Sequence, residues 1–466
     1  MGRPSPLALE EIAPVFDRIL VGPLALAVSG GADSIALMHL VAEWRADRGD
    51  TGVAPPIVLT VDHGLRSEAA DEAAWVAREA ARLGLAHMKL DWTGPKPASG
   101  LQATARAARY RLMNDCLERE ARERALPAKR SIVTAHHADD QAETFLMRLA
   151  RGSGLDGLSG MRQQETVQPS CQSGGSSGGW TILRPLLQVG KARLVGTLLA
   201  RGLAWREDPS NTSQDFERVR VREALEVLGG LGISATQIER STRRLSRARA
   251  AVVAVLADVA CRLTRLHGGL FAEIDPALFV CVPDELQVRT FAALLEANGG
   301  DSPPARLSQI EALVEQMSQR MDAGRHSEHG HRRRAATLGG CRIERLGDGP
   351  VLIWREAGRD GLPELDLQPG TRRVWDKRFT VALAAGEGEP VLVRALGVDA
   401  ARALGPDLAE HGGPQGRRAP GGALEALPSF WRSGRIVAVP YFESLPQHAP
   451  GCSAAFLAAE VFSGTA

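Results

Sequence analysis

The chain has 466 residues, of which 44% are hydrophobic and 24% charged, and its formal net charge is +1. This length exceeds one ordinary domain, and the lack of a targeting pattern or a long apolar stretch predicts a cytoplasmic globular protein that does not span a membrane. Six cysteines lie far apart with no C-x-x-C pair, so the sequence suggests neither a zinc ribbon nor a redox pair.

The first informative stretch runs from Leu24 to Leu40, where an apolar strand pattern stops at small residues and an apolar helix pattern begins. Gly30 and Gly31 allow a tight turn, and free N–H groups near Ser34 at the start of the helix favour a phosphate. Asp33 suits an anion site when a divalent cation lies between it and the phosphates, so it suggests magnesium with nucleotide. The loop lacks the lysine of a Walker A motif. A glycine-rich turn without ligand is the plainer alternative, but it gives no reason for the aspartate.

Strand and helix patterns then alternate. Strands are predicted at 57–62, 87–90 and 131–135, and helices at 69–83, 101–122 and 140–151. This alternation predicts a doubly wound parallel sheet of the α/β class. Ligands bind such sheets at the carboxyl ends of the strands. The loop at Ser29, the segment 62–64 and the run 136–140 are therefore expected to converge.

The later part of the chain changes in character. Residues 163–179 are polar and of low complexity and are predicted to be a surface loop, and a turn at 208–211 closes the first domain. Residues 217–321 have a helical pattern, followed by a charged segment at 325–334. Short strand patterns with Gly and Pro then predict a small domain with β content, including the hairpin-like pieces TRRVWDKRFTVAL and FWRSGRIVAVPYF. The predicted domains are residues 1–215, 216–346 and 347–466.

Acidic residues gather at the start of the helix predicted at 140–151. Asp140 and Glu143 are three residues apart, and Asp139 and Glu143 are four apart, so carboxylates share one helix face or its first turn. Such acids beside a polyphosphate can hold magnesium or receive an ammonium group. Helix capping by the two aspartates is an open alternative. Zinc binding by His136 and His137 is disfavoured because HHxDD lacks a known ligand spacing, and contact with nucleotide or substrate is favoured.

Several motifs together resemble the tRNA(Ile)-lysidine synthetase family of PP-loop N-type ATP pyrophosphatases. They occur in the family's order and cover roughly the first 225 residues. The motifs are SGGADS (29–34), VDHGLR (61–66), LQATARAARY (101–110), HHADDQAET (136–144), RGSGLDGLSGM (151–161), RPLL (184–187) and REDPSN (206–211). The later domains match the family's longer form in layout only.

The resemblance implies a reaction in two steps. ATP adenylates the oxygen at C2 of the wobble cytidine in a tRNA(Ile) with a CAU anticodon and releases pyrophosphate. Free L-lysine then attacks C2 through its ε-amine and displaces AMP, which leaves lysidine. The expected cofactors are ATP and Mg²⁺, and the sequence leaves a homodimer open.

The resemblance also suggests residue roles. Asp140 and Glu143 are candidates for the lysine ammonium or a second cation, and one of them for the general base, with His137 a weaker candidate. Arg106 or Arg109 would stabilise the charge that develops at phosphorus, and the family similarity favours Arg109; solvated helix arginines are the alternative. The nucleotide would be held by Ser29, Gly30, Gly31, Ala32, Asp33 and Ser34, with Asp62 and His63 near the adenosine and with Asp33 and Asp140 as metal ligands.

A basic stripe is predicted for tRNA binding. Arg240, Arg243, Arg244 and Arg247 fall at i, i+3, i+4 and i+7 of one predicted helix, as contact with phosphates requires. A solvated face with acidic partners is the alternative. Further candidates are Arg218, Arg220, Arg222 and the run 332–334. Because aromatic residues make up only 5% of the chain, recognition is expected through phosphates and shape.

Three other functions are weighed against this one. A thiolase that makes 2-thiocytidine would usually carry C-x-x-C pairs, which are absent here. GMP or NAD synthetases would share the loop at 29–34 but would lack the HHADDQAET and RGSGLDGLSGM stretches. A tRNA-binding protein with a vestigial nucleotide fold would be expected to have lost Asp33, Asp140 or Glu143.

Overall fold

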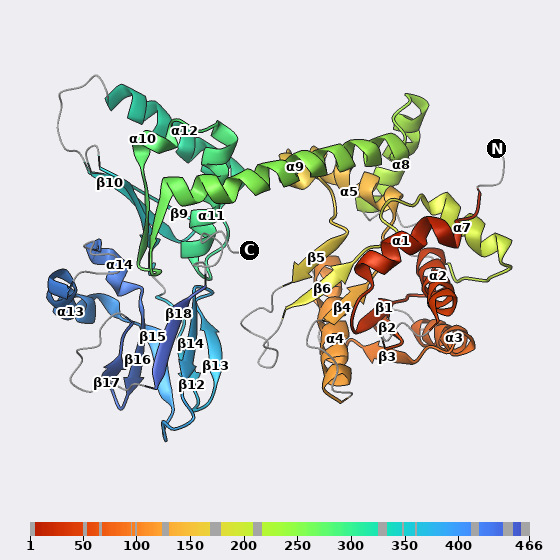
Figure 1. The fold of residues 1–466 in the computed structure, drawn as a ribbon, viewed down its shortest axis with the longest axis horizontal. Coiled ribbons are helices and arrows are strands. Elements are labelled where there is room, and N and C mark those ends of the chain that lie inside the picture. Colours follow the sequence, from red (N-terminus) through yellow and green to blue (C-terminus); the bar gives the residue numbers. More distant parts are fainter. Residues whose placement is uncertain are drawn as a thin grey trace. The chain divides into compact units, whose positions relative to one another are not determined.

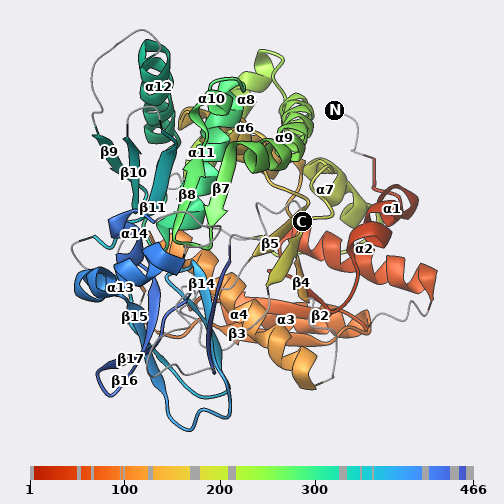
Figure 2. The same ribbon diagram turned by 60° about the vertical axis from the view of Figure 1, so that its left-hand side comes forward.

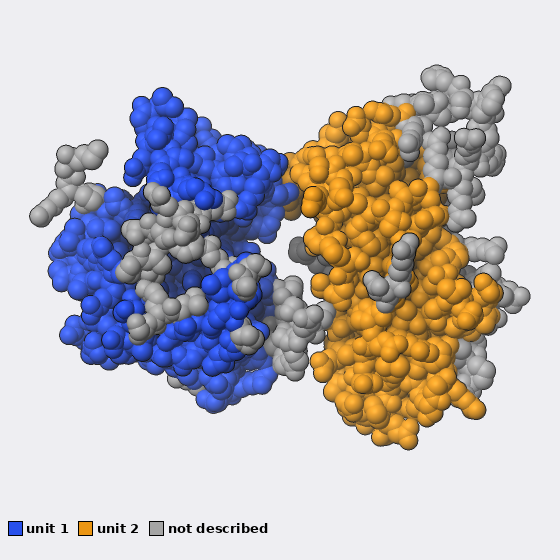
Figure 3. Space-filling view, turned by 180° about the vertical axis from the view of Figure 1, so that it is seen from behind, with its two compact units in different colours: residues 1–249 blue, residues 250–466 orange. Residues whose placement is uncertain are grey.

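The fold in Figure 1 is a computed structural model. It forms two compact units, residues 1–249 and 250–466, which Figure 3 colours separately. The boundaries expected at residues 215 and 346 stay a prediction. The structure describes residues 5–49, 54–64, 68–94, 96–97, 100–123, 130–167, 179–207, 217–324, 333–346, 349–358, 361–411, 419–440 and 451–457.

The first unit is built on a six-stranded sheet with the order β3-β2-β1-β4-β6-β5. Five strands run parallel, and β5 pairs antiparallel with β6, which confirms the predicted α/β class. The strands are β1 (Leu24–Ala27), β2 (Ile57–Asp62), β3 (His87–Asp91), β4 (Arg130–Val133), β5 (Gln164–Val167) and β6 (Trp180–Leu183).

Strand β5 corrects the prediction that 163–179 is a loop throughout. Its residues are mostly exposed, so the sequence has no apolar alternation to mark a strand. The backbone of β6 nevertheless offers a partner at the edge of the sheet, and four residue pairs form from Gln164 to Val167. Residues 168–178 lie outside the described part of the chain.

Helices cover both faces of this sheet. The helices of the first unit are α1 (Leu9–Ile19), α2 (Ala32–Arg48), α3 (Ala69–Arg82), α4 (Leu101–Glu123), α5 (Ala138–Ala150), α6 (Leu155–Leu158), α7 (Lys191–Ala200) and α8 (Glu217–Gly230). Leu24, Leu26 and Val58 pack with α1, α2 and α7, whereas Ala25, Ile57 and Leu59 pack with α4. The strict alternation along β1 and β2 therefore sets two layers. Figures 1 and 2 show α1, α2 and α7 gathered on the side of the sheet away from α4.

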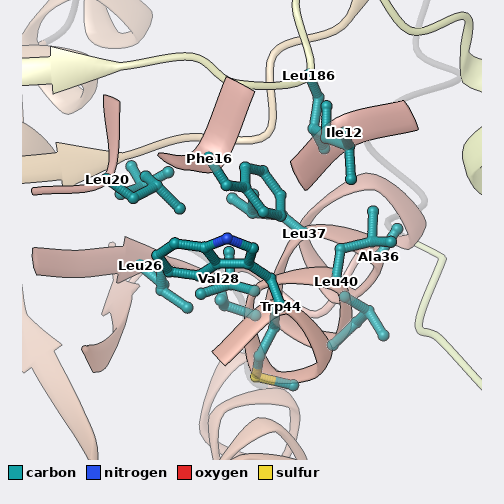
Figure 4. Close-up of a cluster of buried hydrophobic side chains, with 14 of the residues drawn as sticks. Ile12, Phe16, Leu20, Leu26, Val28, Ala36, Leu37, Leu40, Trp44 and Leu186 are labelled. Carbon is teal, nitrogen blue, oxygen red and sulfur yellow. The ribbon is translucent and has the colours of Figure 1, made fainter. Parts of the chain in front are cut away.

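The core beneath α2 fixes the helix that follows β1. Phe16 of α1 and Trp44 of α2 meet edge to face with ring centroids 5.8 Å apart, and Leu26, Leu37 and Leu40 surround them (Figure 4). The indole of Trp44 donates to Asp17 Oδ1 at 2.8 Å, so its polar atom is satisfied. The loop before α2 consequently stands on a rigid base.

The second unit contains three antiparallel sheets, with the orders β7-β8-β11-β10-β9, β12-β15-β16-β17 and β13-β14-β18. Both hairpin-like pieces of the sequence form hairpins, β13–β14 and β16–β17. The strands are β7 (Thr264–His267), β8 (Phe271–Ile274), β9 (Arg333–Leu338), β10 (Cys341–Leu346), β11 (Val351–Arg355), β12 (Leu365–Leu367), β13 (Arg372–Trp375), β14 (Phe379–Leu383), β15 (Val391–Ala395), β16 (Pro428–Arg432), β17 (Arg435–Ala438) and β18 (Cys452–Phe456).

Strands β7 and β8 contradict the prediction that 217–321 is helical throughout. The helix α9 (Ala235–Leu263) ends at β7, and Gly268 and Gly269 turn the chain into β8 with φ of +57° and +81°. The rest of this stretch is helical, with α10 (Pro276–Phe279), α11 (Asp284–Gly299) and α12 (Leu307–Gly324).

Two more helices, α13 (Gly397–His411) and α14 (Gly421–Glu425), complete the described elements of the second unit. The predicted charged segment at 325–334 is described only at its last two residues, which begin β9. Among the described residues, none of the helices is both long and apolar enough to cross a membrane.

Candidate functional site

The loop between β1 and α2 has the form of a phosphate site. Gly30 has a φ of +94°, a conformation that side chains disfavour, and Gly31 is the N-cap of α2. The first helical bond runs from Ile35 N to Gly31 O at 3.0 Å. The N–H groups of Ala32, Asp33 and Ser34 therefore have no partner within the helix, and they sit at the positive end of its dipole.

Two residues brace this loop. Ser34 is buried, and its hydroxyl donates to Gly31 O at 2.9 Å and accepts from Ser29 N at 3.2 Å. From the REDPSN motif, the backbone N–H of Arg206 donates to Gly30 O at 2.9 Å, and its guanidinium lies 5.4 Å from the Trp75 ring centroid. The turn at 208–211 lies outside the described residues. The motif thus contributes to the loop through its first residue.

The loop and the start of α5 meet at His137. Its Nε2 lies 3.4 Å from Asp33 Oδ2 and 3.5 Å from Asp140 Oδ2, and its Nδ1 lies 3.6 Å from Asp139 Oδ2. Burial opposes a charge on this imidazole, but the neighbouring carboxylates of Asp139, Asp33 and Asp140 raise the pKa of His137 to about 10. We call Asp33, His137, Asp139, Asp140 and Glu143 the acidic centre. The two loops converge as the sheet topology predicts.

Both aspartates at the start of α5 do cap helices. Asp140 Oδ2 accepts from His137 N at 2.9 Å, and Asp139 Oδ2 accepts from the N–H of Lys191, the first residue of α7, at 2.8 Å. Asp33 differs from them, because its Oδ1 is buried and lacks a hydrogen-bond partner. The capping alternative therefore accounts for one oxygen of each α5 aspartate, but not for Asp33.

Glu143 has an ion-pair partner that the sequence did not identify. It is 3% exposed, and its Oε1 accepts from Nε of Arg222 on α8 at 2.5 Å. Its Oε2 is buried and has no hydrogen-bond partner. Burial opposes the charge of Arg222, but Glu143, Asp140 and Asp33 together raise its pKa. The sequence suggested Arg222 only as a phosphate contact, because nothing local links two residues 79 positions apart.

The end of β2 forms a separate part of the site. Asp62 accepts from Gly64 N at 2.8 Å and from Lys89 Nζ at 3.1 Å, so its carboxylate shapes this turn. Both ring nitrogens of His63 are buried without a hydrogen-bond partner. Burial lowers the pKa of His63, and the charges of Arg109 and Lys96 lower it further. This imidazole is therefore neutral near pH 7.

The arginines predicted on α4 are exposed. The guanidinium of Arg106 lies 5.2 Å from the Tyr110 ring centroid.

The histidine before His137 is neutral. Burial and the charges of Arg184 and Arg106 lower the pKa of His136 to about 3, and its Nδ1 lies 2.8 Å from Thr134 Oγ1. Near pH 7, His136 is therefore neutral, whereas the adjacent His137 is protonated. The described residues contain no group of three or more His, Cys, Asp or Glu placed to hold a metal by themselves.

The loop that follows α5 is clamped by one side chain. The amide of Gln141 donates to Met161 O at 2.9 Å and accepts from Met161 N at 2.7 Å. Gly160 has a φ of +71°, and a Cβ there would lie 2.5 Å from Gln141 Oε1 and 2.5 Å from Thr242 Cγ2. The RGSGLDGLSGM motif is thereby fixed against α5, and only glycine fits at position 160.

The basic stripe lies on α9 as predicted. Arg240, Arg243, Arg244 and Arg247 are all exposed, whereas Ile238 and Thr242 are buried. Arg243 Nε lies 3.9 Å from Glu239 Oε1, a contact typical of a solvated face. The stripe is thus a continuous exposed row of cations in which one member has an acidic neighbour.

Comparison with known proteins gives a consistent picture. Residues 11–227 match the family model described as a PP-loop domain. A tRNA(Ile)-lysidine synthase of Ruegeria pomeroyi is 38% identical over 90% of this chain and 88% of its own. The tRNA(Ile)-lysidine synthase of Bradyrhizobium diazoefficiens is 41% identical over 69% of this chain and 85% of its own. That of Rhodopseudomonas palustris is 40% identical over 71% of this chain and 90% of its own. The chain therefore belongs to the tRNA(Ile)-lysidine synthase family.

Proposed function

We propose that this chain is an ATP-dependent ligase that joins L-lysine to C2 of the wobble cytidine of tRNA(Ile) with a CAU anticodon. The observation that carries the proposal is the 3.4 Å approach of Asp33, from the phosphate loop, to His137 at the start of α5. This approach brings a polyphosphate site and a carboxylate site together at the ends of β1 and β4. A nucleotide and an amine can then act on the same base.

The nucleotide is proposed to bind with its phosphates on the N–H groups at the start of α2. Asp33 Oδ1 is a buried oxygen without a hydrogen-bond partner, which suits it to bind a cation. Asp33 and Asp140 would hold Mg²⁺, which usually takes only one or two carboxylates when it also binds substrate phosphates. When bound, the ion would neutralise charge on the phosphates. The unpartnered ring nitrogens of His63 are available for the adenosine.

Lysine is proposed to bind at Glu143. Arg222 holds Oε1, and the buried Oε2 is left as an acceptor for an ammonium group. Asp140 lies one helical turn before Glu143 on α5 and adds negative charge. His137 is protonated at neutral pH and forms an ion pair with Asp33, so the carboxylates are the stronger candidates for the general base.

The proposed reaction has two steps, and each one exchanges one bond for another. Cytidine O2 forms a bond to the α-phosphorus of ATP while the bond from that phosphorus to the leaving pyrophosphate breaks. A carboxylate of the acidic centre takes a proton from the lysine ε-ammonium. The amine then bonds to C2, and the bond from C2 to the adenylated oxygen breaks to release AMP. Arg109 or Arg106 would stabilise the negative charge that develops at phosphorus.

The tRNA is proposed to extend from the acidic centre over the basic stripe of Arg240, Arg243, Arg244 and Arg247. Three of these side chains are exposed without an acidic partner among the described ion pairs, and phosphates would supply one. Residues 216–346 and 347–466 are proposed to share recognition of the rest of the tRNA. A homodimer stays a prediction.

The test combines purified full chain, ATP, Mg²⁺, radiolabelled lysine and unmodified CAU tRNA(Ile), followed by nuclease digestion. Label is expected in a modified cytidine for the wild type. Asp33→Asn should lose both pyrophosphate release and label, whereas Glu143→Gln should keep pyrophosphate release and lose label. Pyrophosphate release by the wild type without lysine incorporation would overturn the proposed nucleophile and leave the adenylation step standing.

A further inference from the structure

A cleft of about 690 Å³ lies along one face of α5. Thr144, Met147 and Arg148 of this helix and Arg151 at its C-cap line the cleft, and their spacing places them on a single face. Asp140 precedes Thr144 by four residues, so the cleft begins about 6 Å along the helix axis from the acidic centre. An extended ligand with one end at the acidic centre would therefore continue into the cleft.

The cleft is strongly cationic. Among the described residues, seven arginines and two carboxylates line it, a formal net charge of +5 in a chain whose total is +1. The arginines come from α4, α5, α8 and α9 and from the segments around β5 and β6. Like charges gathered in one concave surface repel one another unless an anion neutralises them. This concentration indicates a polyanionic ligand.

Some of these arginines also build the walls. Arg148 donates to Gly157 O at 2.8 Å and to Gly160 O at 3.0 Å, which holds the RGSGLDGLSGM loop. Arg184 is 2% exposed and donates to Arg162 O at 2.9 Å and to Glu165 Oε2 at 2.7 Å. Its Nε is buried without a hydrogen-bond partner. The walls are thus rigid and still carry positive charge.

Other arginines present their charge to solvent. Arg106, Arg162 and Arg218 are exposed. Arg106 and Arg218 also act electrostatically on His136, the residue that precedes His137 of the acidic centre. The described residues of the lining include no aromatic ring. A ligand here is consequently recognised by charge and hydrogen bonds and not by stacking of its bases.

We propose that this cleft binds the backbone phosphates of the RNA nucleotides next to the cytidine that reacts. Guanidinium groups match phosphate oxygens in geometry and remain charged at every working pH. The phosphates of ATP already have a site at the start of α2, which leaves the cleft for the second polyanion. The inference rests on the proposed function in taking an RNA base as the substrate.

The test measures binding of unmodified CAU tRNA(Ile) and of its isolated anticodon stem-loop over a range of salt concentrations, without lysine. Arg162→Gln and Arg218→Gln remove exposed charges from the cleft. Arg119→Gln is the matched control, because it removes an exposed charge from α4 about 20 Å along the helix from Arg106. Thermal unfolding of each variant and the Kd for ATP are measured in parallel.

Each cleft variant should weaken binding of both RNAs by about 3–10-fold, and it should reduce the slope of log K against log salt by about 0.7–0.9. Arg119→Gln should change neither quantity, and all variants should bind ATP as the wild type does. Unchanged RNA binding in both cleft variants would overturn the inference. A raised Kd for ATP with unchanged RNA binding would assign the cleft to the nucleotide instead. Because binding is measured without catalysis, tight RNA binding without lysidine formation would count against the proposed function alone.

Discussion

Each unit of the molecule contains a buried cluster of charges, and the two clusters differ in how completely they are paired. In the second unit, Asp376 Oδ1 accepts from Asp301 N and Arg355 Nη2, both at 3.1 Å. Its Oδ2 accepts from Arg355 Nε at 3.0 Å and from Arg378 Nε at 2.7 Å. In the acidic centre, by contrast, Asp33 Oδ1 and Glu143 Oε2 are buried and unpartnered. A closed network stabilises a fold, whereas an open one indicates a place for a ligand.

The closed network joins distant parts of the second unit. Arg378 donates to Gly269 O, in the turn between β7 and β8, at 3.3 Å and to Ala426 O at 2.5 Å. Arg355 donates to Ser302 Oγ at 3.0 Å, beyond the end of α11. Asp376 itself has a φ of +47°, which is unfavourable for a non-glycine residue and is held by these bonds. Its role is structural, because every oxygen is occupied.

The largest expected effect comes from breaking the closed network. Asp376→Ala would leave two buried guanidinium groups without a counter-charge, and it should lower the free energy of unfolding by about 3–5 kcal/mol. Chemical denaturation of the full chain measures this change. Asp301→Ala is the control, because its ion pair with Lys377 is exposed and should contribute less than about 1 kcal/mol. Equal losses in the two variants would contradict the comparison.

A substitution in the open network should change the stability of the fold little but should greatly reduce activity. Glu143→Gln keeps the shape of the side chain and removes a buried charge that has only one partner, so the free energy of unfolding should change by less than about 1 kcal/mol. Lysine incorporation should fall by at least about 100-fold through loss of the ammonium acceptor. Denaturation and the label assay are run on the same preparation. A large loss of stability with retained activity would make Glu143 a structural residue like Asp376.

The pH dependence of stability sharpens the comparison. The pKa of His136 is about 3 when folded and near 6.5 when unfolded, so its contribution is complete above pH 6.5 and is lost as pH falls toward 3. His136→Asn, whose amide can replace Nδ1 opposite Thr134, should reduce the loss of stability between pH 6.5 and 5 by about 1.6 kcal/mol. His87→Asn should have a smaller effect, because burial alone lowers the pKa of His87. Identical pH profiles for His136→Asn and the wild type would refute this role.

The smallest effect is expected at Arg222, which is part of the open network but lies on its exposed side. Arg222→Gln should raise the KM for lysine by about 10-fold, because Glu143 loses the group that fixes its orientation. Arg222→Lys should restore part of that loss, and the KM for ATP should stay unchanged in both variants. Steady-state kinetics with each substrate varied in turn distinguishes this result from a general loss of folded enzyme.

The sequence predicts those features that depend on local chemistry. Continuous apolar runs mark β1 and β2, and the two glycines before Asp33 mark the phosphate loop, so both could be located in advance. The partner of Glu143 could not, because its contact with Arg222 depends on how α8 packs against α5. Strands β7 and β8 were missed because the long helical pattern of α9 leads into them and a Gly-Gly turn is a weak signal. Asp376 carries no motif, and its importance depends on burial alone.

The clamp between Gln141 and the backbone of Met161 limits the insertions and deletions that the gene can accept in this region. Its two hydrogen bonds join residues 20 positions apart, and Gly160 tolerates no side chain between them. A codon gained or lost within this stretch would pull Met161 away from the amide or force a Cβ into it. Functional descendants of this gene should therefore keep the number of residues between positions 142 and 159 constant.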